Sequence, residues 1–541
     1  MMAVLVALVM LAPLLALGWS ALQGSAGLWS HLWANVLPTA LFNTTVLLLG
    51  VGVLVMVLGT GSAWLVTAYA FPGRGVLGWA LLLPLAVPTY IAAFAYLDVL
   101  HPLGPVQGLV RELLGYSSPR EFRLPDIRHL AGCIVLLGFV LYPYVYLTTR
   151  ALFMTQAAGL LEAARSLGAS PLQVFWRVAL PLARPAIAVG VALALLETLN
   201  DIGASEFLGV QTLTVSIYTT WVSRGDLAGA AQIALAMLVL VALLMALDKH
   251  GRRRQRYASV LRPRPMQPRQ LRGAKAMLAF ALGALPVLFG FLVPAAYLLW
   301  EAVARLQEAG FSPQLLSALW NTVRVALLAT AVAMGLGLAV AWALRLAHAR
   351  RRGGLAAASS RIAMLGYAVP GTVLAIGLLV PAGALDALLS DVLVAAGGSA
   401  RMLLMGSVGV LVLAYTLRFL AVSVGGIEAG LARIPASLDQ AAASLGERSG
   451  GMLRRVHLPL LRPALAAAAL LVFVDTMKEL SATLVLRPMN FETLATWLYA
   501  EAARGTYEEG AMAALLIVLA GLLPVILLAR TGAAHGTAHE S

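Results

Sequence analysis

The sequence predicts an all-α polytopic membrane protein of about twelve transmembrane helices in two parallel six-helix repeats. Three observations carry this prediction. Of the 541 residues, 61% are hydrophobic and only 11% are charged, the apolar residues fall into long runs, and the second half repeats motifs of the first. A soluble domain carries about 25% charged residues. This chain has too few charged side chains to cover a water-exposed surface, so most of its surface must face lipid.

About twelve apolar runs are long enough to cross a bilayer, because about 20 helical residues span a hydrocarbon core of about 30 Å. The predicted spans are residues 2–21, 41–69, 76–99, 130–149, 186–207, 227–247, 276–299, 319–344, 358–380, 402–424, 463–485 and 508–529. The first run has no Lys or Arg ahead of it, so it lacks the basic start of a signal peptide and is expected to remain as a span. With both termini in the cytoplasm, most Lys and Arg residues fall on cytoplasmic segments, as the positive-inside rule requires.

The net charge of +14 is concentrated in the basic segments. Ten of the 38 Lys and Arg residues lie between Lys249 and Lys275, and three more are consecutive at Arg350–Arg352. Basic segments beside apolar helices hold the topology near anionic lipid, so the expected partner of this charge is membrane lipid and not nucleic acid. The single cysteine, Cys133, lies in an apolar run, which excludes disulfide frameworks and cysteine-based metal sites.

The two halves of the chain are predicted to be repeats of six spans each. Residues 1–248 form the first repeat, residues 249–275 a basic cytoplasmic linker, and residues 276–541 the second repeat. The repeat markers, each 278 positions apart, are Asn43-Thr44 and Asn321-Thr322, Glu197-Thr198 and Asp475-Thr476, and Asp201 and Glu479. An even number of helices per repeat makes the repeats parallel, related by an axis along the membrane normal.

A polar loop follows the fourth span of each repeat. The first copy reads EAARSLGASPLQVFWRVALPLARP (Glu162–Pro185), and the second reads QAAASLGERSGGMLRRVHLPLLRP (Gln440–Pro463). In the first copy, Gly168 is expected to end a short helix, and Ser170-Pro171 to cap and begin the next. In the second, Ser437 followed by Gln440 fits a capping box with Ser437 as the N-cap. Two short helices at an angle are therefore expected in each loop.

The spacing E-A-A-x3-G-x9-[I/V]-x-L-P in this loop resembles the cytoplasmic coupling loop of ABC importer permeases. The resemblance implies a type I ABC importer permease-like fold, with two loops that bind two copies of an ATP-binding cassette ATPase. The residues that it assigns to this contact are Glu162, Ala163, Ala164, Gly168, Leu180, Pro181, Asp439, Gln440, Ala441, Ala442, Gly446, Leu458 and Pro459. Gln440 departs from the acidic residue that is usual there, although Asp439 precedes it.

The chain carries no ATPase motif of its own. A P-loop needs a Lys directly after Gly, because the lysine must reach the phosphates that the glycine-rich backbone holds. The three lysines, Lys249, Lys275 and Lys478, follow Asp, Ala and Met. ATP is therefore expected to be used by partner subunits, and this chain is expected to be a transport permease with no catalytic residues, no cofactor and no resident metal.

Two further stretches, Glu197–Trp221 and Asp475–Tyr499, look like the fused permeases of bacterial ferric-iron ABC importers. That group is close to thiamine, phosphonate and polyamine permeases, which remain alternatives. The resemblance covers essentially the whole chain. It implies a multi-pass protein of the bacterial cytoplasmic (inner) membrane and a periplasmic or extracellular substrate-binding protein. Ser481 departs from the proline that ferric-type permeases usually carry.

Four carboxylates, Glu197, Asp201, Asp475 and Glu479, lie in otherwise apolar helices. A charge at mid-membrane costs about 2.5–3.5 kcal/mol on the insertion scale, so such residues face a cavity or a partner. They could line a translocation path for a cation such as Fe³⁺, or lie near the helix ends and form salt bridges. Lys478 projects about 100° from Glu479 around the helix, so it is expected to pair with another helix.

Two other classes of protein were weighed against an ABC permease. A secondary transporter driven by an ion gradient also uses parallel repeats and would explain the carboxylates, but it would leave both polar loops unexplained. A membrane enzyme lacks support, because the sequence shows no nucleophile–base pair and no metal-ligand motif.

Overall fold

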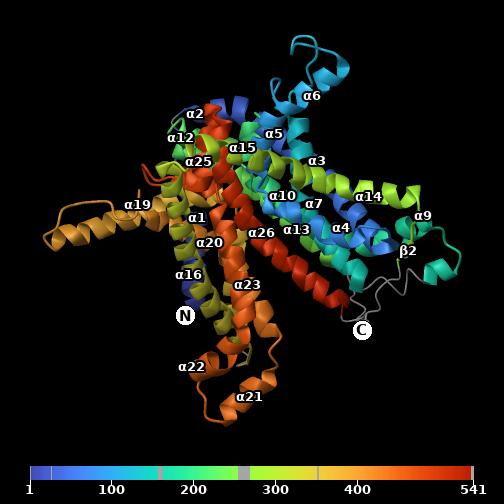
Figure 1. Cartoon of the computed structure of the whole chain (residues 1–541). Coiled ribbons are helices and arrows are strands. Elements are labelled where there is room, and N and C mark those ends of the chain that lie inside the picture. Colours follow the sequence, from blue (N-terminus) through green and yellow to red (C-terminus); the bar gives the residue numbers. More distant parts are fainter. Residues whose placement is uncertain (1, 26, 156–162, 254–267, 350–352, 538–541) are drawn as a thin grey trace. The chain divides into compact units, whose positions relative to one another are not determined.

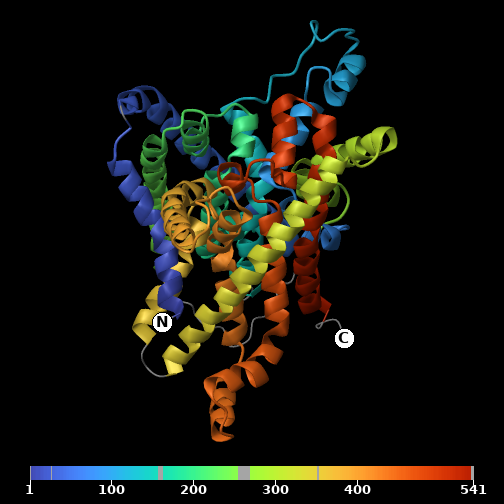
Figure 2. The same ribbon diagram turned by 90° about the vertical axis from the view of Figure 1, so that its left-hand side faces the viewer.

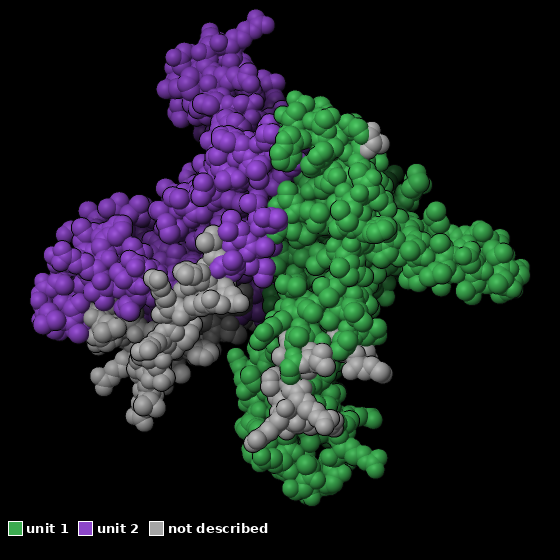
Figure 3. All heavy atoms as spheres, turned by 180° about the vertical axis from the view of Figure 1, so that it is seen from behind, with its two compact units in different colours: residues 1–35, 216–238, 311–500 green, residues 36–215, 239–310, 501–541 purple. Residues whose placement is uncertain are grey.

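The computed structural model describes residues 2–25, 27–155, 163–253, 268–349 and 353–537, and most of these residues are helical (Figure 1). They divide into two compact units (Figure 3). Unit 1 comprises residues 1–35, 216–238 and 311–500, and unit 2 comprises residues 36–215, 239–310 and 501–541. Each unit therefore combines segments from both halves of the sequence, and the repeat boundaries drawn from the sequence stay a prediction.

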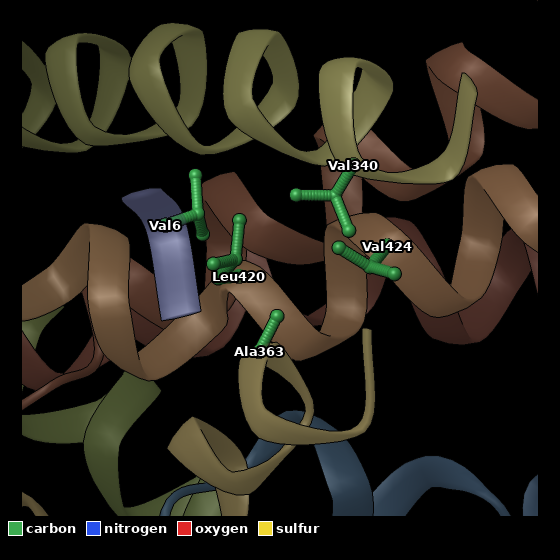
Figure 4. Close-up of a cluster of buried hydrophobic side chains, with 5 residues drawn as sticks. All are labelled: Val6, Val340, Ala363, Leu420 and Val424. Atoms are coloured by element: carbon green, nitrogen blue, oxygen red, sulfur yellow. The ribbon is translucent and has the colours of Figure 1, made fainter. Parts of the chain in front are cut away.

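The elements of unit 1 are α1 (Met2–Leu22), α2 (Leu28–His31), α16 (Pro313–Ala349), α17 (Gly353–Ala363), α18 (Leu365–Ala368), α19 (Gly371–Ala395), α20 (Val408–Ala432), α21 (Ala436–Ser444), α22 (Ser449–Met452), η5 (Leu453–His457), α23 (Leu458–Met477) and α24 (Ser481–Leu486). Helix α16 is the long yellow helix of Figure 2. One apolar cluster of this unit joins α1, α16, α17 and α20 through Val6, Val340, Ala363, Leu420 and Val424 (Figure 4).

The elements of unit 2 are α3 (Leu37–Ala68), β1 (Tyr69–Ala70), α4 (Arg74–Ala80), η2 (Leu83–Ala86), α5 (Thr89–Val99), α6 (Pro105–Leu114), α7 (Leu130–Thr155), α9 (Pro171–Val174), η3 (Phe175–Ala179), α10 (Leu180–Asn200), α11 (Gly203–Phe207), β2 (Arg269–Gln270), α14 (Ala274–Val287), η4 (Leu288–Leu292), α15 (Val293–Ala309) and α26 (Tyr507–Thr537). Four elements continue from one unit into the other: η1 (Leu32–Val36), α12 (Leu213–Val222), α13 (Leu227–Arg253) and α25 (Leu494–Arg504).

Close helix packing in unit 2 depends on two glycines. A Cβ on Gly59 of α3 would lie 2.6 Å from Val145 Cβ and 2.8 Å from the Tyr142 carbonyl oxygen of α7. A Cβ on Gly190 of α10 would lie 2.5 Å from Val145 Cα. Small residues let helix backbones approach each other, as is typical of membrane proteins. Helices α3 and α10 therefore both pack directly against the backbone of α7.

Segments from the second half of the sequence are also part of unit 2. The Tyr297 hydroxyl of α15 donates to Asp98 Oδ2 of α5 at 2.8 Å. The end of the basic linker forms strand β2, which pairs in parallel with β1. The described end of the linker is thus joined to the residues that directly follow α3.

The predicted number of spans is confirmed. Among the described residues, eleven helices are long and apolar enough to cross a membrane, or twelve if one bent pair counts as a span. That pair is Arg74–Ala86 with Thr89–Val99, bent by 93°.

The third span of each repeat was predicted as one continuous helix, 76–99 and 358–380, and this was wrong. Pro88 and Pro370 interrupt these runs, with extended ψ angles of 147° and 145°. Val87 and Val369, which precede them, are extended as well, because the proline ring disfavours the helical conformation in the residue before it. A new helix then starts directly after each proline, and α19 runs on to Ala395.

The fifth spans, predicted as 186–207 and 463–485, also break. Helix α10 ends at Asn200 and the short helix α11 follows, while α23 ends at Met477 and the short helix α24 follows. Continuous apolar composition hides these breaks.

Four π-helical turns in the described residues share one cause. The turns η1, η3, η4 and η5 each end two residues before a proline, namely Pro38, Pro181, Pro294 and Pro459. Proline has no N–H, and its ring clashes with the carbonyl four residues earlier. A π turn widens the helix by one residue and accommodates that carbonyl. The Leu-Pro pair of each polar loop therefore places a wide turn at the junction between the loop and the following span.

Candidate functional site

The first polar loop is described from Ala163 onward, and Glu162 lies outside the described residues. Residues 163–166 are helical, and Gly168 leaves the helix with φ +84°. Ser170 then caps α9 in a capping box: Gln173 N donates to Ser170 Oγ, and Ser170 N donates to Gln173 Oε1. The predicted roles of Gly168 and Ser170-Pro171 are confirmed.

The second polar loop has the same outline. Helix α21 ends before Gly446, which has φ +79°, and α22 and η5 lead into Leu458 and Pro459. The predicted N-cap at Ser437 is wrong, because Pro435 is extended and the helix starts at Ala436. Ser437 is thus already the second helical residue. Helices α21 and α22 are seen at the foot of Figure 1.

The residues assigned to the ATPase contact differ in exposure. Ala163, Gly168, Gln440, Ala441, Gly446 and Pro459 are exposed, Ala164, Leu180, Pro181, Asp439 and Leu458 are half-buried, and Ala442 is buried. The sequence analysis missed two leucines. Leu167 and Leu445, each directly before the positive-φ glycine, are 88% and 85% exposed. The repeated triplet Ser-Leu-Gly was the signal that could have identified them. Single exposed leucines are common on protein surfaces, so it is their recurrence at the same place in both loops that makes these two candidates for a protein contact.

Asp439 faces into unit 1. Arg345 Nε of α16 donates to Asp439 Oδ2 at 2.9 Å, and His457 Nε2 lies 2.7 Å from Asp439 Oδ1. The His457 ring is buried and lies 4.9 Å from the ring of Trp342. At the matching place in unit 2, Trp64 packs against Phe175 with ring centroids 5.3 Å apart. Both loops are thus anchored by an aromatic contact, and the second has in addition the ion pair between Arg345 and Asp439.

Asp201 lies at the break between α10 and α11 and is buried. Its carboxylate accepts hydrogen bonds from the Thr89 hydroxyl at 2.6 Å, from Ser205 N at 2.9 Å, from Ser205 Oγ at 3.1 Å and from Ala204 N at 3.3 Å. The carboxylate therefore caps the short helix that follows the break.

Glu479 lies at the matching break in unit 1. It accepts from Ala482 N and Thr483 N, at 3.0 and 3.1 Å, and from the Thr483 hydroxyl at 2.8 Å. It also pairs with Arg418 NH1 of α20 at 3.2 Å. Helix α19 starts with Gly371, whereas α5 of unit 2 starts with Thr89, so among the described residues Glu479 receives no hydrogen bond that corresponds to the one from Thr89. A Cβ on Gly371 would lie 2.0 Å from Arg418 NH1 and 2.8 Å from Glu479 Oε1, so a side chain there would displace the guanidinium from its present place.

The other two carboxylates are less enclosed. Glu197 is half-buried in α10. Asp475 forms an ion pair with Lys478 at 2.8 Å, a partner that the sequence analysis did not give to this lysine. The helix ends at Met477, so the angular spacing of a regular helix no longer applies to Lys478. Glu197 and Asp201 belong to unit 2, whereas Asp475 and Glu479 belong to unit 1, and a path lined by all four stays a prediction.

The repeat markers at the start of the second and eighth predicted spans hold equivalent loops. Asn43 Nδ2 donates to the Gln211 carbonyl at 3.0 Å, and Asn321 Nδ2 donates to the Glu492 carbonyl at 3.0 Å. The hydroxyls of Thr44 and Thr322 accept from Leu213 N at 3.0 Å and Leu494 N at 2.8 Å. The duplication is therefore visible in hydrogen bonds as well as in sequence.

Eleven or twelve candidate spans among the described residues, a duplicated polar loop and paired helix breaks indicate a polytopic membrane protein of the kind that forms permeases. Residues 70–257 match the family described as binding-protein-dependent transport system inner membrane component. The chain is 30% identical over 249 residues to the sulfate transport system permease protein CysT of Salmonella typhimurium, across 45% of this chain and 86% of the relative. The chain belongs to this family and is a multi-pass permease component of an ABC importer of the inner membrane, with the type I fold.

Other relatives carry different substrate names. The chain is 26% identical over 493 residues to the Fe(3+)-transport system permease protein FbpB 2 of Haemophilus influenzae, across 90% of this chain and 89% of the relative. It is 30% identical over 209 residues to the putative 2-aminoethylphosphonate transport system permease protein PhnU of Salmonella choleraesuis, across 38% of this chain and 69% of the relative.

Proposed function

We propose that this chain translocates ferric iron into the cytoplasm as the permease of a binding-protein-dependent ABC importer. In this proposal two copies of a separate ATPase dock on the loops around Gly168 and Gly446. A substrate-binding protein delivers iron on the opposite side, and both chain termini lie in the cytoplasm. This chain binds no cofactor, and ATP is used by the partner subunits.

The observation that carries the proposal is the shared form of the two loops. Each has a positive-φ glycine, an exposed leucine before it, and a π turn before a Leu-Pro pair. Two docking points of the same form suit two copies of one partner. A secondary transporter would have no use for them.

Iron is favoured over the other substrates by the extent of similarity. The Fe(3+) relative matches 90% of the chain and so includes both repeats, whereas the sulfate and phosphonate relatives match less than half. Carboxylates in the membrane segments also suit a cation, because low-dielectric surroundings strengthen the attraction between opposite charges.

An oxyanion such as sulfate or a phosphonate is the second candidate. Two relatives with 30% identity carry such names, and Arg418 is a buried cation within unit 1. Its pairing with Glu479 leaves little net charge at that place, which weakens this candidate.

Docking is tested at the two glycines. Apart from its chain neighbours, no described residue has an atom within 4 Å of a Cβ built on Gly168 or on Gly446, so substitution there strains the backbone without a clash among the described residues. A left-handed backbone costs a residue other than glycine about 1–2 kcal/mol, whereas asparagine adopts it more readily. The double variant Gly168→Val/Gly446→Val should insert normally but lose most substrate-stimulated ATP hydrolysis in proteoliposomes, and the corresponding Asn variant should keep most of it.

Gly115→Val is the matched control, because Gly115 has φ +76° and equally open surroundings outside both loops. It should leave ATP hydrolysis unchanged. Normal coupling in the double Val variant would refute the docking assignment.

The substrate is tested separately by uptake of radio-iron, sulfate and 2-aminoethylphosphonate into vesicles that contain the permease, its ATPase and its binding protein. Uptake of iron alone is expected. Uptake of an oxyanion without iron would refute the ferric assignment and leave the docking result untouched.

A further inference from the structure

The Asp439 carboxylate holds both ends of the connection between α20 and α23, which contains the second polar loop. This connection leaves α20 at Ala432, passes through α21 and α22, and returns through η5 to α23. Asp439, on α21, accepts from Arg345 Nε at 2.9 Å and from Arg345 NH2 at 3.2 Å. His457, the last residue of η5, contacts the same carboxylate at 2.7 Å. A residue early in the loop is thus joined to the residue at which the loop ends.

Arg345 also holds the start of the loop. Its NH1 donates to the Leu431 carbonyl at 2.6 Å, and its NH2 donates to the Ile434 carbonyl at 3.1 Å. Leu431 lies in the last turn of α20 and Ile434 lies two residues beyond its end, where backbone carbonyls lack the regular helical partner; the Leu431 carbonyl also accepts from Ile434 N at 3.1 Å. The planar guanidinium can satisfy the carboxylate and both carbonyls together, which a lysine could not do. Because Arg345 belongs to α16, it links α16, α20 and the loop.

The surroundings of these three side chains are enclosed. His457 is buried against Trp342, and Trp342 packs with Ala442 of α21 and Met452 of α22 in one apolar cluster. Asp439 is half-buried, whereas its neighbour Gln440 is exposed. Asp439 therefore has its acceptor oxygens directed at groups of its own unit and is poorly placed to contact a partner.

We propose that Arg345, Asp439 and His457, which we call the loop brace, are positioning residues that make the second polar loop and helix α16 move as one body. The inference rests on the proposed docking of the ATPase at this loop. It changes the role of Asp439 from a contact residue to a residue that transmits the movement of the loop into the membrane helices. In unit 2 the aromatic contact between Trp64 and Phe175 holds the other loop.

The test separates binding of the ATPase from coupling. Asp439→Ala and Arg345→Ala permeases are reconstituted with the ATPase and the binding protein. The affinity for the ATPase should stay within about 3-fold of wild type, and basal ATP hydrolysis should persist. Substrate transported per ATP hydrolysed should fall at least 10-fold, because a loop released from α16 can move without moving the helices.

The matched control is Glu509→Gln, which removes the charge of a partly exposed ion pair with Arg305 outside both polar loops. It should leave transport per ATP unchanged. If Asp439→Ala does not fold, Asp439→Asn is measured in the same way, since Asn keeps a hydrogen-bond acceptor for Arg345 and loses only the charge. It should show a smaller loss of coupling.

Two results would overturn the brace. A loss of ATPase affinity of more than 10-fold in Asp439→Ala would make Asp439 a contact residue, and unchanged transport per ATP would remove any role in coupling. If the proposed function itself were wrong, the measurements would differ from these two results. The wild-type permease would then bind no ATPase, and the Gly446→Val variant would behave like wild type.

Discussion

At the scale of single residues, the carboxylates at matching positions of the two repeats have different hydrogen-bond partners. Asp201 accepts a hydrogen bond from the Thr89 hydroxyl, whereas Glu479 forms an ion pair with the Arg418 guanidinium. Val140 stands 278 positions before Arg418, so the first repeat has no cation there. The acidic residues were predicted from the repeat alone, but Thr89 and Arg418 could not be, because these two donors come from helices distant in sequence. Three of the four hydrogen bonds described for Asp201 come from Ala204 and Ser205 at the start of α11, so its carboxylate serves first as a helix cap.

The first prediction concerns this difference. Arg418→Val alone should destabilise the permease by about 3–5 kcal/mol, because it leaves the Glu479 carboxylate buried without its cation. Gly371→Thr alone should also destabilise, because its Cβ would lie 2.0 Å from Arg418 NH1. The triple variant Gly371→Thr/Arg418→Val/Glu479→Asp copies the site of unit 2 and should be more stable than either single variant. Unfolding of the purified protein in detergent measures this order. A triple variant less stable than both single variants would show that the two sites are not interchangeable.

At the scale of elements, hydropathy and the repeat predicted the number of spans and the place of both loops. They could not predict the breaks at Pro88, Pro370, Asp201 and Glu479, because the residues on both sides are apolar and a moving average does not register one backbone change. Proline alone was an ambiguous signal. Pro143 lies inside α7, which continues past it, whereas Pro88 starts a helix. A proline can remain inside a helix when a π turn accommodates the carbonyl four residues before it. Whether that turn can form depends on the packing of neighbouring helices, which the sequence does not show.

The second prediction concerns the π turns next to the loops. Replacing Pro181 and Pro459 with Ala removes the clash that maintains η3 and η5. The turns should revert to α-helix, which rotates the loop relative to the following span by about 100°, one residue of helix. The thermal midpoint should stay the same or rise, since Ala is favoured over Pro by about 3 kcal/mol within a helix. Substrate-stimulated ATP hydrolysis should fall.

Pro294→Ala is the control for this prediction, because it follows η4, a π turn away from both loops. It should leave ATP hydrolysis unchanged. Unchanged hydrolysis in the Pro181→Ala/Pro459→Ala variant would show that the wide turns do not set the orientation of the loops.

At the scale of the whole molecule, one chain carries two docking loops, so it should bind two ATPase subunits. The exposed leucines provide the test. Burying a leucine that is 85–88% exposed contributes about 1.5–3 kcal/mol, which is about 10- to 100-fold in affinity. Leu167→Asp or Leu445→Asp alone should therefore leave one strong docking point, and the double variant should leave none. Light scattering of the purified complex should show two ATPase copies for the wild type, one for each single variant and none for the double variant.

Met489→Asp is the control, since Met489 is 94% exposed but lies outside both loops. Two ATPase copies on the double variant would show that the leucines do not form the contact. A single copy on the wild type would refute the two-to-one assembly.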